Sequence, residues 1–439
     1  MNIGKQMIYG SSAMDNATPS VKDAVLRFGG IAMDGATEFG LDEEAVSRHI
    51  LLLGGSGCGK TNTFLHAVRA TMDRLTQDDV ILIFDTKGEY YQKFHRPGDL
   101  VLGNAGWIID QSCTWNIFGD VIADGWDDMH VTMNAREMAA SLFLGRGSTT
   151  QPFFCNAAKD FFRAILVYFI RRAVEDPANW RGKLNNRALV DWLLSATKED
   201  YLRVFNSYPD MKSLISYIGD GTSNQALGVF AELNSMVSDY FVGIFAEYRP
   251  NRSISIRNTI RGKGGRILFI EYDLSMGETL APVYRLLLDL GFKEALVRKD
   301  KTGHFYVFAD EFKLIPLSRQ IDDVLNFGRE QRVSVMAGIQ SIDQLYAVYG
   351  QEKGAVLAGG FGNLFAFHTN DHSSREYITK RLGQNLAAYT YWDDAQKKNI
   401  YREREGYTVE HWDQINLGRG QAFISVGYSE PFLFEFQRF

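Results

Sequence analysis

Two short stretches of the chain carry the residue types that bind phosphate and magnesium, and the first follows the apolar run "RHILLL". This stretch, "GGSGCGKT" at 54–61, fits the pattern G-x-x-x-x-G-K-S/T of a Walker A loop. Backbone N–H groups of such a loop converge on phosphate oxygens, its lysine reaches the β and γ oxygens, and its last hydroxyl binds Mg²⁺. The stretch therefore predicts a site for ATP and Mg²⁺. The residues expected to bind the nucleotide are Gly54, Gly55, Ser56, Gly57, Cys58, Gly59, Lys60, Thr61 and Asn62.

The second stretch is "FYVFADE", an apolar run that ends in Asp310 and Glu311. A Walker A site needs a carboxylate on a neighbouring strand, so we expect Asp310 to share the metal ion with Thr61, through water. Glu311 would polarise the attacking water, which makes hydrolysis a better interpretation than binding alone. The alternative is that the acidic pair only caps the helix that follows.

Other polar residues are candidates for sensing and accelerating hydrolysis. Gln340 ends the next apolar run and could contact the γ-phosphate, or could simply solvate the end of a strand. Arg329 in "NFGREQR" is the first candidate for an arginine finger supplied by a neighbouring subunit, and Arg332 and Arg375 are further options. Each of these arginines could equally be a surface residue.

The stretch "RNTIRGKGGR" at 257–266 concentrates cationic residues and glycines. Such a flexible basic loop could track a phosphate backbone through Arg261, Lys263 and Arg266, or could be a solvated turn. His368 and His372 have the spacing of two metal ligands, but they lie in an expected strand end and loop rather than on a helix, which disfavours a metal site.

The bulk composition is that of a globular protein of 439 residues with a formal charge of -6, so any contact with nucleic acid must come from a local cluster. Three scattered cysteines suit a reducing compartment. The longest apolar runs are shorter than a bilayer requires, and the first residues lack the apolar segment of a signal peptide. We therefore expect a cytoplasmic protein whose attachment to a membrane, if any, depends on a partner.

Apolar strands that alternate with helices predict an α/β fold with a mostly parallel central sheet. Expected strands are "RHILLL", Val80 to Phe84, Leu100 to Ile109, "RILFIEY", "HFYVFAD", "VSVMAGIQ", "NLFAFHT" and "QAFISV". The stretch 126–248 lacks clear strands and is expected to be an inserted all-α domain, which divides the nucleotide-binding domain into 1–125 and 249–439. The tail "FLFEFQRF" alternates like an edge strand with Phe432, Phe434 and Phe436 on one side, or could be an aromatic docking tail.

The order of these motifs resembles the coupling ATPases of type IV secretion and conjugation, the TraD/TraG/TrwB group, which belong with the FtsK/HerA translocases. The resemblance rests on the Walker A loop, "IFDTKGEY", the helical insertion, "FADEF", "GREQRVSVMAGIQS" and "RLG" in this order, and runs from about Arg48 to the last residue. It implies a RecA-like P-loop NTPase domain with an inserted all-α domain, assembled as a homo-oligomer that is expected to be a hexameric ring. Such a ring would move DNA, single- or double-stranded, or a relaxase joined to it, toward a secretion channel using ATP.

The resemblance also implies roles for individual residues. Asp85 and Glu89 fall on the second-strand motif and would shape the nucleotide site or its subunit interface, and Arg329 matches the trans-acting finger. One departure is that family members start with transmembrane helices, whereas this chain starts almost at the nucleotide domain. We therefore expect either recruitment by a membrane-anchored secretion component or a soluble DNA pump of the FtsK/HerA type.

Two further functions remain open from the sequence. The chain could be a nucleotide-gated adaptor that recruits protein substrates to a secretion system without touching DNA. Alternatively, the bound nucleotide could be only structural, in which case Glu311 would have no part in turnover.

Overall fold

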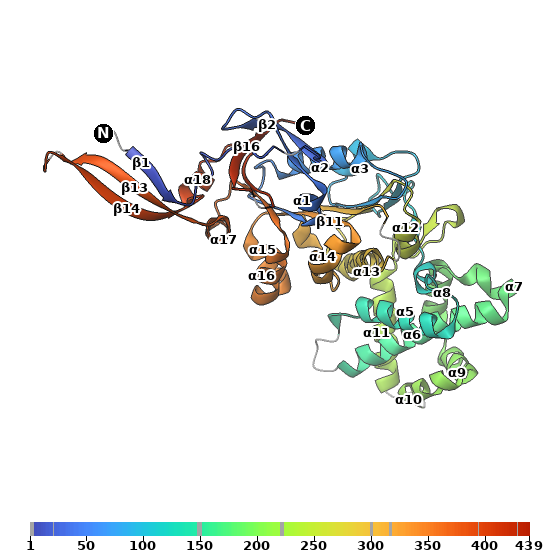
Figure 1. Cartoon of the computed structure of the whole chain (residues 1–439). Coiled ribbons are helices and arrows are strands. Elements are labelled where there is room, and N and C mark those ends of the chain that lie inside the picture. The colour runs from blue at the N-terminus through green and yellow to red at the C-terminus, as the bar shows by residue number, and fades with distance from the viewer. Residues whose placement is uncertain are drawn as a thin grey trace.

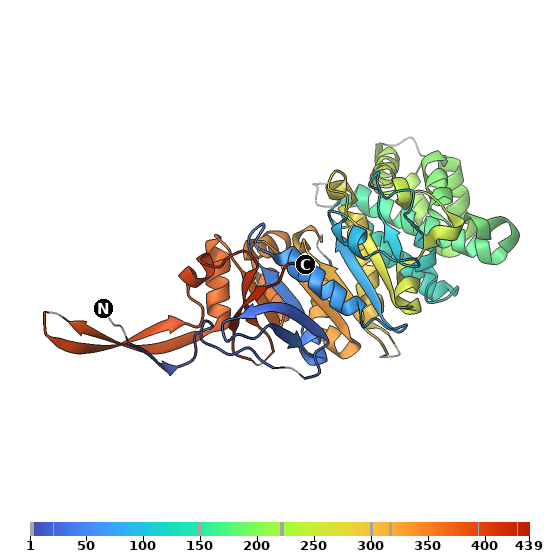
Figure 2. The same cartoon turned by 90° about the horizontal axis from the view of Figure 1, so that it is seen from above.

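The structure is a computed structural model that describes residues 4–20, 22–146, 152–219, 224–298, 302–315, 318–393, 395–427 and 429–439. The molecule is elongated and has three parts (Figure 1): a central sheet with helices on both faces, a helical lobe at one end and a narrow β arm at the other. Seen from above, the three parts lie in a row (Figure 2). The C-terminus lies over the central sheet.

The central sheet has eleven strands in the part of the chain that the structure describes, in the order β3-β2-β16-β15-β12-β4-β11-β10-β5-β9-β6. Strands from β12 to β6 are parallel, and β15, β16, β2 and β3 add an antiparallel section. The strands are β2 (Leu26–Ala32), β3 (Glu38–Leu41), β4 (Ile50–Leu53), β5 (Val80–Asp85), β6 (Leu100–Leu102), β9 (Arg266–Glu271), β10 (Phe305–Ala309), β11 (Val333–Ile339), β12 (Asn363–Phe367), β15 (Gln421–Ser425) and β16 (Phe432–Phe436).

The sheet is buried on both faces because its strands are apolar at nearly every position. In β4, Ile50 and Leu52 join one hydrophobic cluster, and Leu51 and Leu53 join another. The first cluster lies under α2 and α3, and the second under α13 to α16, which cover the opposite face (Figure 1). These helices are α2 (Lys60–Met72), α3 (Glu89–Phe94), α13 (Gly277–Leu296), α14 (Ile321–Phe327), α15 (Ile342–Tyr349) and α16 (Gln351–Gly360).

The lobe is entirely helical where the structure describes it. The chain enters it after β7 (Thr114–Trp115) and leaves it before β8 (Ser253–Ile254), and these two strands pair in parallel. We propose that the lobe is an inserted all-α domain with 126 and 248 as its boundaries. Its α-helices are α5 (Asp128–Leu142), α6 (Pro152–Glu175), α7 (Pro177–Trp180), α8 (Asn186–Ser195), α9 (Lys198–Ser207), α10 (Ile215–Ile218) and α11 (Asn224–Tyr240). Helix α4 (Ile117–Val121) leads from β7 to the lobe, and α12 (Ile256–Gly262) leads back to the sheet.

Short 3-10 helices connect these elements. They are η2 (Arg181–Lys183), η3 (Pro209–Leu214), η4 (Gly243–Phe245), η5 (Pro250–Arg252), η6 (Phe312–Leu314) and η7 (Gly328–Gln331).

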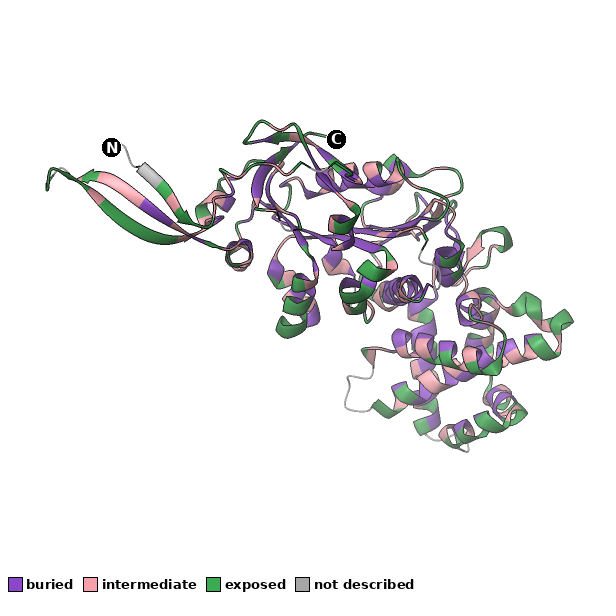
Figure 3. Cartoon of the chain, in the orientation of Figure 1, coloured by how far each residue is buried: buried purple, intermediate pink, exposed green. Residues whose placement is uncertain are grey.

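The β arm was not predicted from the sequence. It is a three-stranded antiparallel sheet in which β13 (Gln384–Asp393) pairs with β1 (Gly4–Tyr9) on one side and β14 (Lys398–Tyr407) on the other. The arm projects away from the body (Figure 1), and most of β14 is exposed, unlike the strands of the central sheet (Figure 3). Helices α17 (His372–Leu382) and α18 (His411–Ile415) lie at its base, and α1 (Glu43–Ser47) precedes β4.

Two predicted strands differ from the structure. The strand expected through Leu100 to Ile109 is only β6, because the chain turns after Leu102. The tail strand, β16, is not at an edge of the sheet, since β2 pairs with it on the far side from β15. Its three phenylalanines at 432, 434 and 436 are buried in the first hydrophobic cluster, so the alternative of an aromatic docking tail is also wrong.

None of the helices in the described residues has the length and apolarity needed to span a membrane.

Candidate nucleotide site

The candidate site lies where parallel strands end side by side. The Walker A loop follows β4, and Gln340 and Asp310 directly follow β11 and β10; β11 pairs with β4, and β10 pairs with the other side of β11. Ligands of open α/β sheets bind at this carboxyl edge because loops there converge from adjacent strands. The sheet order thus brings together three motifs that are far apart in the sequence.

The loop is held in shape by its surroundings. A Cβ atom at Gly54 would lie 2.5 Å from Cβ of Phe367, and Gly59 has a φ of 123° while its missing Cβ would lie 3.0 Å from Cα of Gly420. Neither position has room for a side chain. The N–H of Gly55 donates to the carbonyl of His368, and the N–H of Gly420 donates to the carbonyl of Cys58, both at 2.8 Å. Strand β12 and the turn before β15 therefore brace the loop.

Lys60 and Thr61 begin α2 and point into the site. The Lys60 ammonium is buried and donates to the carbonyl oxygens of Gly54 at 2.6 Å and Gly55 at 3.0 Å, so it lies across its own loop. The Thr61 hydroxyl donates to Oδ2 of Asp310 at 2.6 Å. A hydroxyl and a carboxylate in this contact are the oxygen ligands that suit Mg²⁺, so the residues present fit the metal expected from the sequence.

Glu311, Gln340 and Lys87 form a second polar group beside Asp310. The Gln340 amide donates to Oε1 of Glu311 at 3.2 Å and to Oε2 at 3.3 Å. The Lys87 ammonium lies 3.9 Å from Oε1 of Glu311 and is largely exposed. Glu311 is thus held between two donors at the mouth of the site, where a water molecule can reach it.

The C-terminal segment supplies a wall of the site that sequence reasoning missed. The site opens into a cavity of about 570 Å³, large enough for a nucleotide. Besides the motif residues, the cavity is lined by Arg419, Gly420, Glu435, Phe436, Gln437 and Arg438. Asn62 ties this wall to α2, because its amide donates to the carbonyl of Gln437 at 2.9 Å and its side-chain oxygen accepts the N–H of Phe439 at 2.8 Å.

The thiol of Cys58 does not have the lowered pKa that a helix N-terminus can produce. Burial raises the pKa of this thiol, although the Lys60 charge opposes the effect. Cys58 is therefore a small buried residue of the loop rather than a reactive one.

A model of the family described as "Type IV secretion-system coupling protein DNA-binding domain" matches residues 36–411. The chain belongs to this family. Coupling protein TraD of Escherichia coli (strain K12) is 23% identical over 385 residues, which cover 84% of this chain and 49% of TraD. The chain therefore spans about half the length of this curated coupling protein.

Solved structures of coupling protein TrwB have the same fold. An unbound monoclinic form of this bacterial conjugative protein superposes with a TM-score of 0.70 at 20% identity, covering 93% of this chain and 88% of that chain. TrwB in complex with ADP and Mg²⁺ gives a TM-score of 0.69 at 19% identity. This match covers 96% of this chain and 90% of the TrwB chain. VirB4 of Thermoanaerobacter pseudethanolicus superposes with a TM-score of 0.55 at 14% identity. The match covers 96% of this chain and 99% of the VirB4 chain. The RecA-like α/β fold expected from the sequence is confirmed.

The coupling-protein motif "DTKGEY" shapes one side of the site. The Asp85 carboxylate accepts the N–H groups of Lys87, Gly88, Tyr90 and Tyr91 and so fixes the start of α3. This places the Tyr90 hydroxyl 3.0 Å from Oδ2 of Asp310, to which it donates. Glu89 is the first residue of α3. Asp85 thus acts on the nucleotide site through the helix that it caps.

Two of the three candidate finger residues, Arg329 and Arg332, lie at the opposite end of the parallel strands from the cavity. Arg329 is in η7, before the start of β11, whereas the cavity lies at the end of β11. Its guanidinium is half exposed and lies 3.1 Å from Oε1 of Glu44. Arg332 lies on the same edge of the sheet, 3.9 Å from Glu43. Arg375 donates to the carbonyl of Asn370 at 2.6 Å. A contact between Arg329 and a nucleotide therefore requires a neighbouring subunit.

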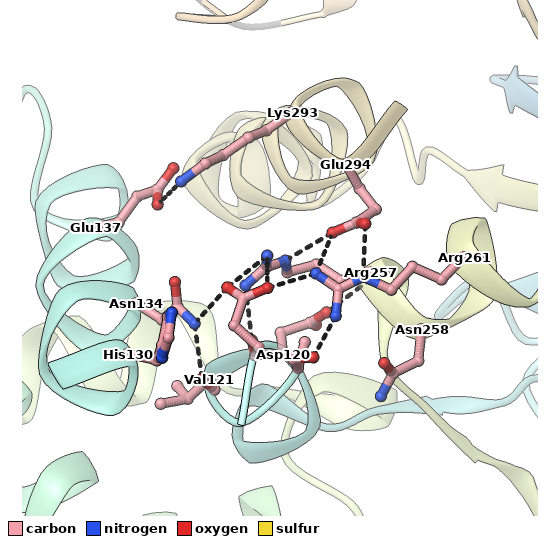
Figure 4. Close-up of polar contacts among 12 residues, drawn as sticks. Asp120, Val121, His130, Asn134, Glu137, Arg257, Asn258, Arg261, Lys293 and Glu294 are labelled. Carbon is pink, nitrogen blue, oxygen red and sulfur yellow. Dashed lines mark hydrogen bonds and ion pairs between the residues drawn. The ribbon is translucent and has the colours of Figure 1, made fainter. Parts of the chain in front are cut away.

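The basic stretch of the coupling protein is not the flexible loop that the sequence suggested. Its first residues form α12, and Figure 4 shows Arg257 and Arg261 pointing toward Glu294 of α13. Arg257 contacts Asp124 at 2.7 Å and Glu294 at 3.1 Å, and Arg261 contacts the same two carboxylates. These arginines join the lobe to the sheet.

The remaining cations of the basic stretch are Lys263 and Arg266. The Lys263 ammonium is buried and donates to the hydroxyl of Thr302 at 2.8 Å, and Arg266 is the first residue of β9. Because Arg257, Arg261 and Lys263 have partners within the protein, the stretch is an ordered helix and turn. Contact of Arg261, Lys263 and Arg266 with a phosphate backbone stays a prediction.

The two histidines do not form a metal site with other ligands. His372 is exposed at the start of α17, which Asp371 caps by accepting the N–H of Ser374 at 2.8 Å. The His372 ring stacks on that of His411, with centroids 5.8 Å apart. Across the described ranges, no three histidine, cysteine or acidic side chains gather as metal ligands do.

Proposed function

We propose that this chain is the ATP-hydrolysing motor of a coupling protein, which assembles as a homo-oligomeric ring, a hexamer, and moves DNA or a nucleoprotein toward a type IV secretion channel. The observation that carries the proposal is the 2.6 Å contact between Thr61 and Asp310, two residues 249 positions apart. Together with membership in the coupling-protein family, it supports a site for ATP and Mg²⁺ built for hydrolysis.

The roles of the residues follow from their geometry. ATP supplies the phosphoanhydride bond and Mg²⁺ balances the charge of its phosphates. Lys60 would leave the Gly54 carbonyl to meet the β and γ oxygens, and Thr61 and Asp310 would hold the metal. Glu311 would accept a proton from the attacking water while Gln340 holds the carboxylate in place.

The position of Arg329 favours a ring. Arg329 lies at the amino ends of the parallel strands, whereas the cavity lies at their carboxyl ends. The seven residues of β11 separate the two, a distance of about 20 Å along the strand. In a head-to-tail ring each subunit presents this edge to the cavity of its neighbour, so Arg329 could stabilise the charge of the transition state in trans.

We propose that DNA contacts the ring interior and the helical lobe in addition to the basic stretch, in which Arg257 and Arg261 are engaged by Asp124 and Glu294. A relaxase or another secretion substrate would be the cargo. A membrane-anchored component of the secretion system would hold the ring at the inner face of the cell membrane, on its cytoplasmic side.

The test of the motor is ATPase activity measured against DNA concentration and protein concentration. We expect turnover to rise with DNA concentration and with protein concentration. DNA would promote closure of the ring, and in the ring each cavity would receive Arg329 from a neighbouring subunit. Glu311→Gln should bind ATP as tightly as the unchanged protein but lose at least about 100-fold in turnover. Flat activity in both titrations would contradict the motor, and full activity of the glutamine variant would favour a structural nucleotide.

A second candidate function is a nucleotide-gated adaptor for protein substrates. It is favoured by the net charge of -6 and by the ion pairs that engage arginines of the basic stretch within the protein. The salt dependence of binding separates the two candidates. Affinity for duplex DNA falls with log salt concentration by a slope of about 0.9 per phosphate contacted. A steep slope supports the motor, whereas absence of DNA binding at low salt supports the adaptor.

A further inference from the structure

The β arm has two faces of opposite charge. Neighbouring residues of a strand point to opposite faces, and residues that pair directly across antiparallel strands share a face. The register of β13 and β14 runs without a shift from Gln384↔Tyr407 to Asp393↔Lys398. The face of each side chain in this hairpin therefore follows from the pairing.

One face is basic and aromatic. Arg402 pairs with Tyr389, Arg404 with Ala387, and Lys398 with Asp393. Arg402 and Arg404 are exposed. The Arg404 guanidinium lies 5.8 Å from the ring centroid of Trp412 at the base of the arm. Asp393 accepts the N–H groups of Ala395 and Gln396 and so belongs to the turn.

The other face is acidic and also aromatic. Glu403 pairs with Ala388, Glu405 with Leu386, and Tyr401 with Thr390. Both glutamates are exposed, and 57% of Tyr401 is exposed. The Tyr401 hydroxyl donates to Oε1 of Glu403 at 3.3 Å, as expected for two residues on one face.

The charges of the two faces are not neutralised within the arm. Across the described ranges, no ion pair within 4.0 Å joins Arg402, Glu403, Arg404 or Glu405 to an opposite charge. The two faces carry Arg402 and Arg404 on one side and Glu403 and Glu405 on the other, each pair two positions apart. On both faces the charges are therefore spaced by about 7 Å along the strand.

We propose that the arm is a contact between copies of this chain, in which the basic face of one arm packs on the acidic face of the next. The partner is a second copy because one arm carries both complementary surfaces with the same spacing. The aromatic side chains of both faces would form the apolar centre of the contact, and the charges would set its direction.

A head-to-tail ring brings these charges to matching heights. Rotation about the ring axis leaves each arm at the same level, so residues 402–404 of one copy face residues 403–405 of its neighbour. The offset is one residue, about 3.4 Å, which arginine and glutamate side chains can span. The contact uses different surfaces on the two copies, which is the kind that closes into a ring. The inference rests on the ring in the proposed function and names one of its interfaces.

The experiment reverses the charge of each face and measures assembly by sedimentation and mass photometry with an ATP analogue. Arg402→Glu with Arg404→Glu gives an arm with two acidic faces, and Glu403→Arg with Glu405→Arg gives one with two basic faces. We expect each variant alone to need about tenfold or more protein to assemble, because like charges then meet at the contact. High salt should reduce the difference.

An equimolar mixture of the two variants provides the decisive measurement. Alternating copies again present opposite charges at every contact, so the mixture should assemble as readily as the unchanged protein. A single chain with all four substitutions should also assemble by itself. Arg187→Glu on the exposed face of α8 is the matched control and should have no effect. Circular dichroism and ATP binding should be unchanged, because all four arm residues are exposed.

Three results would overturn the proposal. The first is assembly of both reversed variants at the concentration of the unchanged protein. The second is a loss confined to the Arg402 and Arg404 variant and accompanied by weaker binding to DNA or anionic vesicles, which would make the basic face a polyanion site. The third is failure of the unchanged protein to assemble, which would also remove the ring, whereas the first two leave the ring and its ATPase in place.

Discussion

Asp85 and Glu271 form a buried carboxyl pair at the ends of β5 and β9. The two residues pair directly in the parallel register of these strands. Burial, with a contribution from Asp85, raises the pKa of Glu271 to about 9. Burial also raises the pKa of Asp85, but four backbone N–H groups of the α3 start oppose the effect. Glu271 therefore holds the proton at neutral pH, whereas Asp85 accepts the four N–H groups at the start of α3.

The first prediction concerns the pH dependence of stability. Between the ordinary glutamate pKa of 4.5 and about 9, the folded state binds a proton at Glu271 that the unfolded state has lost. The free energy of unfolding therefore falls by up to about 1.4 kcal/mol per pH unit from this group in that window. Glu271→Gln removes the titration, so its unfolding free energy should fall less steeply between neutral and mildly alkaline pH. Denaturant titrations at several pH values measure the slope, and equal slopes would contradict the protonated state.

The second prediction concerns the Tyr90 hydroxyl, which donates to the carboxylate oxygen that also accepts from Thr61. Tyr90→Phe removes one of two groups that orient Asp310 for the metal. A hydrogen bond to a charged group contributes about 1.5–3 kcal/mol, so the Mg²⁺ concentration for half-maximal ATPase should rise by roughly 10- to 100-fold. Binding of ATP without Mg²⁺ should be unchanged. Tyr91→Phe is the control, because that hydroxyl donates to Gln111 instead. An unchanged Mg²⁺ dependence would mean that Thr61 alone orients Asp310.

At the scale of elements, α12 connects the sheet and the lobe through ion pairs. Arg257 is 4% exposed and contacts Asp124 before the lobe and Glu294 on α13, which is also buried. Figure 4 shows that Arg257 and Arg261 of α12 point toward Glu294 of α13, and that Lys293 of α13 points toward Glu137 of α5. The network can therefore fix how the lobe meets the sheet.

The third prediction follows from this network. Arg257→Ala removes one of the two arginines that pair with the buried Glu294 carboxylate and with Asp124, so the free energy of unfolding should fall by about 1.5–3 kcal/mol. Arg187→Ala, which removes an exposed pair with Asp191, should cost about 0–1 kcal/mol. Thermal and denaturant unfolding measure both variants. Equal small effects would show that the network does not hold the lobe.

The parallel strands could be predicted from the sequence because each is a short apolar run, buried on both faces. The arm could not, because β14 is a run of exposed charged residues and β1 pairs with a strand about 380 positions away. Strands β2 and β3 were also missed. Strand β2 contains two glycines, and like β1 it pairs with a strand near the other end of the chain, β16.

The candidate site was predictable only where its residues form local motifs. Thr61 and Asp310 meet as expected because each motif ends a neighbouring strand. Arg419 and Gln437 carry no local signal, since their place in the cavity depends on β15 and β16 lying beside the Walker A loop. The helix in the basic stretch was not predicted, because Asp124 and Glu294, which pair with Arg257 and Arg261, lie outside the stretch in the sequence.

At the scale of the whole molecule, the two ends of the parallel strands carry different candidate functional residues. One end carries the nucleotide cavity, and the other carries Arg329 and Arg332 beside the acidic residues of α1. With Arg329 as the proposed finger, a monomer would have a cavity without a finger and a finger without a cavity. Assembly into the proposed ring would bring the two together, and activity would then depend on which subunit supplies which residue.

The last prediction tests this division with mixtures of inactive subunits. Lys60→Ala removes the phosphate contact but keeps Arg329, and Arg329→Ala keeps the cavity but loses the finger, so each variant alone should be inactive. In an equimolar random ring, one site in about four joins an intact cavity to a neighbour with an intact finger. The mixture should therefore recover roughly a quarter of the unchanged activity if the sites act independently.

Replacing the first variant with one that carries both Lys60→Ala and Arg329→Ala provides the matched control, because its neighbours then receive no finger and no activity should return. Recovery in the first mixture but not in the second assigns Arg329 to the cavity of the adjacent subunit. If neither mixture recovers while both variants still assemble, the finger is another residue and Arg332, on the same edge of the sheet, is the next to test by the same mixing.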